Sequence, residues 1–179
     1  MGFSISWLAV RNNAVGDNDE TYVLASLGLE KIGATEEFPG KHWCSTRVGE
    51  WTVVWSNSYE PARFRGAPSK LRGEVLVCDV EEHVMYASTS AFNDGVLSWR
   101  IIHDAQRAPD HLAIKGTPPE SFVRIRAEQF ARVSEDLEVD RIFDIPLRMA
   151  KELVGFRHDE EHDSIFDILR VTKPRWKFW

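Results

Sequence analysis

The chain has 179 residues and carries 22 basic against 28 acidic side chains, which gives it a formal net charge of −6 at pH 7. An acidic surface repels phosphate backbones, so this composition argues against general nucleic-acid binding. Hydrophobic residues make up 43% of the chain and charged residues 28%, proportions that are typical of a globular protein and exclude intrinsic disorder.

The sequence carries no sign of a membrane segment, of export or of a disulfide framework. It contains no run of 18 apolar residues, and its first residues lack the basic and apolar regions of a signal peptide. Cys44 and Cys78 lie far apart and outside any CxxC spacing. We therefore expect a soluble cytoplasmic protein with two buried thiols, no membrane span and no cofactor.

The first 30 residues predict a strand followed by a short helix. Apolar and polar residues alternate over residues 3–9, which is typical of a strand. Asp17 and Glu20 have the spacing of a capping box, so they predict the start of a helix that ends near Gly28.

The next segment predicts a β-hairpin between two irregular stretches. Residues 33–41 indicate a connector or a short strand. Residues 43–48 and 51–56 are rich in strand-forming side chains and flank a two-residue turn, which predicts a hairpin. Residues 59–69 hold two prolines and two arginines, which indicate an exposed loop.

The middle of the chain gives the strongest strand pattern, over residues 74–80, 83–92 and 96–103. Between the last two, Asp94-Gly95 predicts a tight hairpin turn, because this dipeptide accepts the positive φ angles of a type I′ turn. This turn places Tyr86 opposite His103, and a one-residue error in the loop would exchange the two faces of the hairpin.

One face of this hairpin carries the aromatic side chains, so it is predicted to be the core face. Its members are Val84, Tyr86, Ser88, Ser90 and Phe92 of the first strand and Leu97, Trp99, Ile101 and His103 of the second.

The remaining elements are mostly helical. After a short strand at residues 110–114, Thr117 and Glu120 form a second capping-box pattern and predict a helix that runs to about Leu137. Another helix is expected from residue 145 to its stop at Gly155.

The whole pattern predicts an α+β fold. We expect a single domain over residues 1–172, built mostly from an antiparallel β-sheet with two to three helices packed on it. A charged loop at 156–164 precedes a short apolar element at 165–172, either a strand or a helical turn. Residues 173–179 form a basic, aromatic C-terminal tail.

A short H-x-x-E-H pattern runs from His158 to His162. In inverted zinc peptidases two histidines at this spacing on a helix hold zinc. Here the pattern follows a predicted helix stop, and its neighbours are charged. We therefore interpret it as a solvated acidic loop and keep His158 and His162 as weak candidates for metal ligands only.

A second group of polar residues could support catalysis. Glu82, His83, His103 and Asp104 lie on neighbouring predicted strands, where they could form a general acid/base pair or a metal site. The predicted register places His83 and His103 on opposite faces, which favours a structural role for His103. The sequence contains no nucleophile elbow, no dinucleotide fingerprint and no Walker loop.

The aromatic residues are candidates for binding. Trp43 and Trp55 exceed what the predicted core needs and are expected at a binding surface. In the tail, Arg175, Trp176 and Trp179 alternate cations with aromatic rings. This tail can either dock on the acidic body of the protein or act as an interaction arm.

The run Glu81-Glu82-His83-Val84-Met85, together with residues 99–104 and Phe143-Asp144-Ile145-Pro146, resembles a family of small uncharacterised bacterial proteins. The resemblance spans most of the chain and brings no activity with it. An acidic, tryptophan-rich α+β chain is also similar in kind to the immunity proteins that neutralise secreted bacterial toxins. These resemblances imply a bacterial protein whose partner is another protein.

Two functional hypotheses follow. The first is a non-enzymatic protein-binding module, immunity- or regulator-like, which acts through an acidic surface rich in aromatic residues. The alternative is a small hydrolase that uses Glu82, His83, His103 and Asp104, with or without a divalent metal.

Overall fold

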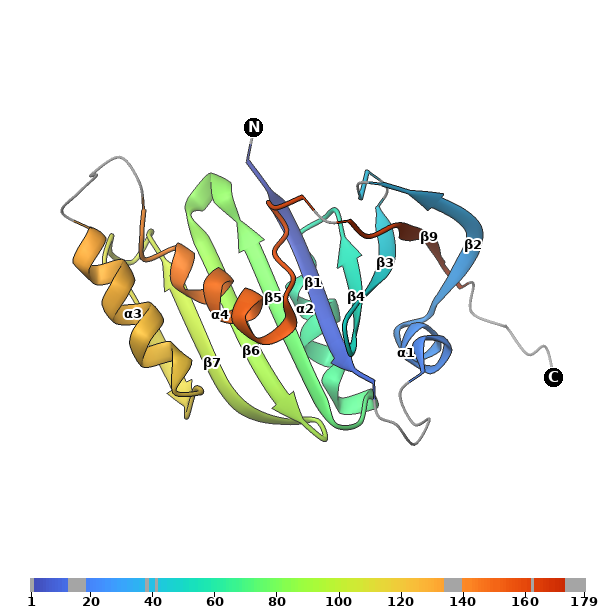
Figure 1. Ribbon diagram of the computed structural model, residues 1–179, viewed down its shortest axis with the longest axis horizontal. Helices are drawn as coiled ribbons and strands as arrows, with labels where there is room; N and C mark the ends of the chain where they lie inside the picture. The colour runs from blue at the N-terminus through green and yellow to red at the C-terminus, as the bar shows by residue number, and fades with distance from the viewer. Residues whose placement is uncertain are drawn as a thin grey trace.

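The computed structural model describes residues 2–12, 19–37, 39–40, 42–133, 140–161 and 163–172. Within them, nine antiparallel strands form one sheet in the order β2-β9-β3-β4-β1-β5-β6-β7-β8 (Figure 1). The strands are β1 (Ser4–Arg11), β2 (Leu29–Glu36), β3 (Trp43–Val48), β4 (Trp51–Ser56), β5 (Glu74–Glu81), β6 (Tyr86–Asn93), β7 (Val96–Asp104), β8 (Ala113–Gly116) and β9 (Phe166–Val171).

Four α-helices and two short 3₁₀ helices accompany the sheet in the described part of the chain. They are α1 (Glu20–Leu27), α2 (Pro61–Gly66), η1 (Pro68–Lys70), η2 (Glu82–Val84), α3 (Ser121–Arg132) and α4 (Asp144–Val154). The predicted antiparallel sheet with accompanying helices is confirmed, and the high proportion of sheet fits an α+β or a mainly β fold. None of these helices has the length and apolar character that crossing a bilayer requires.

Both faces of the sheet are covered, so its central strands bury side chains on either side. In β1, Trp7 points into a core that α4 covers, and Leu8 points into a second core that includes residues of α1 and α2. Figure 1 shows α3 and α4 in front of the sheet and α2 behind it. We call the front side the α4 face and the other side the α2 face.

The expected number of two to three helices was wrong, because α2 lies in the segment that we predicted as an exposed loop. Pro61 stands at the first helical position, where its missing N–H costs nothing. Phe64 is fully buried, with its ring centroid 5.5 Å from that of Trp43. Tertiary packing therefore holds a helix that is too short to show a periodic pattern in sequence.

Several boundaries agree with the sequence and others do not. The β3–β4 hairpin has the predicted bounds, and Val48 pairs with Trp51 across its turn. The 165–172 element is the strand β9. Helix α1 is capped by Asp19, which accepts a hydrogen bond from the backbone N–H of Tyr22, whereas the expected cap Asp17 lies outside the described residues. Helix α3 begins at Ser121 without the predicted capping box.

The turn between β6 and β7 forms as predicted, but the register beyond it does not. Asp94 and Gly95 have φ angles of 48° and 77°, as a type I′ turn requires. Beyond Phe92↔Leu97, Ala91 pairs with Trp99, so Ser98 is an extra residue in β7.

This β-bulge corrects the predicted core face. Trp99, Ile101 and His103 do face α4, but their partners on β6 are Ala91, Thr89 and Ala87. Tyr86, which we expected opposite His103, pairs with Asp104 instead. Strand β6 also starts three residues later than predicted, because His83 and Val84 belong to η2 and Met85 has a positive φ of 51°.

The bulge generates the first prediction, which concerns Gly116 in β8. A Cβ atom on Gly116 would lie 2.1 Å from the carbonyl oxygen of Ser98, and its φ is +74°. Gly33 has a similar φ of +77° but no atom within 4 Å of such a Cβ. We expect Gly116→Ala to lower the free energy of unfolding by at least about 2 kcal/mol more than Gly33→Ala, because only the former adds a clash to the backbone strain. Urea denaturation measures both, and equal losses would contradict the close approach of β8 to the bulge.

Candidate functional site

The structure does not gather the four predicted catalytic residues. His83 is exposed on η2, and its Nδ1 lies 2.7 Å from a carboxylate oxygen of Glu81. Glu82 turns toward the start of β1, where it accepts a hydrogen bond of 2.8 Å from the backbone N–H of Phe3. Neither side chain approaches β7 through these contacts.

His103 and Asp104 point to opposite faces of the sheet. His103 is fully buried on the α4 face, with Nδ1 2.8 Å from the carbonyl oxygen of His111 and Nε2 2.9 Å from Asp140 Oδ2. Both ring nitrogens thus lie against oxygen atoms of the protein itself. Asp104 pairs with Arg107 at 3.2 Å. The geometry supports a structural role for His103.

Asp140 joins His103 to the start of α4. Its other oxygen accepts hydrogen bonds from the backbone N–H groups of Ile142 and Phe143, at 3.1 Å and 3.0 Å. Burial raises the pKa of Asp140, but the contact with His103 and these backbone bonds outweigh burial, so the pKa lies below its usual range. The carboxylate therefore stays ionised and holds the turn before α4 in place.

His158 is not in a solvated loop, which corrects our prediction. It is 2% exposed, and its ring meets Phe3 edge to face with centroids 4.8 Å apart. Its Nε2 lies 3.8 Å from Glu82, which is beyond hydrogen-bond length. Burial lowers the pKa of His158, so the buried ring is held neutral. Its proposed partner His162 lies outside the described residues, within which no three His, Cys, Asp or Glu side chains are placed to hold a metal ion.

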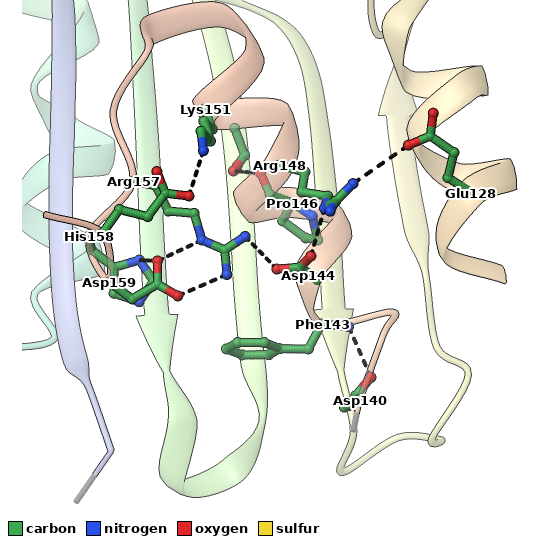
Figure 2. A network of polar contacts seen from close by, with 12 residues as sticks. Glu128, Asp140, Phe143, Asp144, Pro146, Arg148, Lys151, Arg157, His158 and Asp159 are labelled. Carbon is green, nitrogen blue, oxygen red and sulfur yellow. Dashed lines mark hydrogen bonds and ion pairs between the residues drawn. The ribbon is translucent and has the colours of Figure 1, made fainter. Parts of the chain in front are cut away.

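A network of charges links α3, α4 and the segment that follows α4 (Figure 2). Arg157 binds Asp159 through two parallel hydrogen bonds of 2.6 Å and 2.9 Å, and its third nitrogen lies 2.6 Å from Asp144. Asp144 also accepts a bond of 2.8 Å from Arg148, which lies 3.5 Å from Glu128 on α3. Burial lowers the pKa of Arg157, but its contacts with Asp159 and Asp144 outweigh burial and raise it.

The hollow beside this network is lined by several cations, but each of them is already paired with a carboxylate. The cations that line it are Arg124, Arg148, Lys151 and Arg157. Each of them pairs with at least one carboxylate, at distances of 2.6–3.1 Å. An anion would have to displace these carboxylates, so we interpret the network as a structural clamp on the end of α4.

A larger groove opens where α4 ends on the sheet. Its volume is about 790 Å³, and it lies between the last turn of α4, the β3–β4 turn and the face of the sheet. We call it the α4 groove. In Figure 1 the lower front ends of β5 and β6 have no helix over them.

The floor of the α4 groove is apolar. Leu76, Ala91 and Trp99 lie opposite one another on β5, β6 and β7 and form one row across the floor. Ala91 is the small residue of this row, so the floor is lowest between the two larger side chains. Leu153 of α4 and Trp51 of β4 also line the groove.

The rim of the α4 groove carries its charges. Arg11 bonds to Glu50 and to Glu74, each at 2.8 Å, and its guanidinium lies 5.9 Å from the centre of the Trp51 ring. The two carboxylates remain 70% and 54% exposed. Since one guanidinium balances one of them, the rim keeps an excess negative charge.

The predicted binding residues lie elsewhere. Trp43 and Trp55, which we expected at a surface, are 3% and 1% exposed and pack in the two cores. The tail residues Arg175, Trp176 and Trp179 lie outside the described residues. The tryptophans that line the α4 groove are Trp51 and Trp99. The alternation within each strand was the only sequence signal that both residues lie on the α4 face.

Comparison of the chain with protein-family models, curated proteins and solved structures finds no match, and so neither identifies nor excludes a family. The resemblance drawn from the sequence stays a prediction.

The clamp yields a second prediction, for Arg157→Lys. A lysine cannot reproduce the two parallel bonds to Asp159 while reaching Asp144, so we expect a loss of about 1–3 kcal/mol in the free energy of unfolding. The control is Arg124→Lys, because Arg124 pairs with two carboxylates but is 53% exposed, and it should lose less than about 0.5 kcal/mol. Chemical denaturation at pH 7 decides, and equal losses would show that the clamp adds nothing.

The third prediction concerns the pH dependence of stability. In the unfolded chain a histidine titrates near pH 6.5, whereas burial lowers the pKa of folded His158. Below about pH 6.5 the unfolded state therefore binds a proton that the folded state does not, and stability falls by up to about 1.4 kcal/mol per pH unit for this group. Unfolding midpoints at pH 7, 6 and 5 should show a shallower decline for His158→Phe than for wild type. A decline that is the same in both proteins would contradict the assignment.

Proposed function

We propose that the protein is a non-enzymatic binding module that holds a segment of another protein in the α4 groove. The observation that carries the proposal is the α4 groove itself, whose partly exposed apolar side chains include Trp51, Ala91 and Leu153, over a floor completed by the buried Leu76 and Trp99. A concave site of this size, lined by apolar side chains together with a few polar groups, is the default binding site of a protein. The separation of Glu82, His83, His103 and Asp104 leaves the hydrolase without a supporting observation.

The charges of the rim define the partner. Among the described residues that line the groove, the carboxylates Glu50 and Glu74 outnumber the one cation, Arg11, and the chain as a whole has a net charge of −6. The last turn of α4 also ends at the groove, and a helix C-terminus carries a partial negative charge. These features favour a segment that combines apolar side chains with lysine or arginine.

This proposal keeps the non-enzymatic binding module that the sequence predicts, but it assigns binding to a different surface of the protein. Binding through Trp43 and Trp55 is given up because both are buried. An immunity- or regulator-like role, a bacterial origin and a cytoplasmic location stay predictions. The proposal adds to them the α4 groove as the place where a partner chain would lie.

Site-specific photocrosslinking tests the proposal. A photoreactive benzoylphenylalanine replaces Leu153 in the groove or, as control, the exposed Val171 on β9, and each protein is made in the cells that naturally produce it. We expect position 153 to crosslink one protein, through a segment with apolar and basic residues. The control at 171 should not capture this protein, and Ala91→Phe should abolish the crosslink by filling the floor. A groove that crosslinks no protein, or the same proteins as position 171, would overturn the proposal, as would a bound small molecule found by native mass spectrometry.

A further inference from the structure

We infer that the segment bound in the α4 groove is an α-helix that carries a basic side chain about one turn from its apolar anchor. This inference rests on the proposed function and specifies the conformation and chemistry of the partner at the same site.

The first argument concerns backbone hydrogen bonds. The floor residues Leu76, Ala91 and Trp99 of β5, β6 and β7 each pair with a neighbouring strand on both sides. The floor therefore offers no free row of N–H and C=O groups to an extended peptide. Among the described strands, the edges of the sheet are β2, β8 and the end of β7 at residues 96–98, where β8 no longer pairs with it, and of these only Ser98 lines the groove. An extended segment would lose the hydration of its backbone groups on the floor, at about 1–3 kcal/mol for each unsatisfied group, whereas a helix satisfies its own.

The second argument concerns the layer to which the groove belongs. The α4 face is covered by α3 and α4, and the groove is bounded by Leu153 and Val154 of α4 and by Pro119 just before α3. An occupant there completes a layer of helices on a sheet, which is how such faces are commonly buried.

The third argument concerns the spacing of apolar and charged groups. On β5, Leu76 belongs to the apolar row and Glu74 lies two residues away at the rim. Two residues of a strand span about 7 Å. One turn of a helix advances 5.4 Å, so a lysine or arginine three or four positions from an apolar anchor reaches the rim carboxylates.

Three synthetic peptides test the inference. Each has 14 residues with blocked termini. The first has leucines at helical spacing with a lysine four positions from the central leucine, in an alanine background. The second has one proline in its middle, and the third has glutamate in place of lysine. Binding is followed by calorimetry and by the indole N–H signals of Trp51 and Trp99 in NMR spectra.

We expect saturable binding of the first peptide with shifts at both indoles. The proline peptide, the glutamate peptide and the Ala91→Phe protein should each weaken binding at least tenfold. Glu74→Gln should weaken it severalfold, whereas Glu30→Gln should leave it unchanged, because Glu30 is a similarly exposed, arginine-paired carboxylate on β2 at the sheet edge.

The outcomes separate the inference from the proposed function. Equal binding of the helical and proline peptides would overturn the helix, and equal binding of the lysine and glutamate peptides would overturn the basic residue. Failure of all three peptides to bind, with a partner nevertheless crosslinked at position 153, would overturn the inference and leave the proposed function standing. Undiminished binding to Ala91→Phe would remove the groove as the site.

Discussion

One extra residue in β7, Ser98, determines which side chains of β7 reach the α4 face. Because the bulge shifts the register by one residue, Ala91 lies opposite Trp99 and the floor of the α4 groove has a low point between large neighbours. On the same face of β6, two residues from Ala91, Thr89 donates a hydrogen bond of 2.7 Å to the carbonyl oxygen of Pro146 and so ties the sheet to the start of α4. The floor of the groove depends on this single irregularity in β7.

The parts of the fold that could be predicted are those that short stretches of sequence determine. The β3–β4 hairpin and the Asp94-Gly95 turn follow from strand alternation and from the backbone angles that the turn residues accept. The bulge could not be predicted, because Ser98 differs from an ordinary strand residue only through its neighbours in space. Helix α2 was missed for a related reason, since it is stabilised by burial of Phe64 rather than by a helical pattern.

The candidate site was harder to predict from the sequence than the fold was. The α4 groove collects residues from six strands and α4, and no spacing along the chain brings them together. His158 shows the same difficulty, because its acidic neighbours indicate an exposed loop while its burial depends on Phe3, at the other end of the chain. Residue types and local spacing located histidines and carboxylates, but long-range packing decided which of them meet.

The order of the strands has a consequence for how the protein is made. Strand β9 lies between β2 and β3, and the hydroxyl of Thr46 bonds to the carbonyl oxygen of Ile165, 119 positions away. Until β9 has been synthesised, β2 and β3 are left without the neighbour that joins them, and their edges are open to pairing with other chains. Contacts of such high sequence separation also slow folding. A nascent or truncated chain that lacks β9 therefore exposes the edges of β2 and β3 to chaperones and proteases. A chain in which β9 has paired with both strands no longer does.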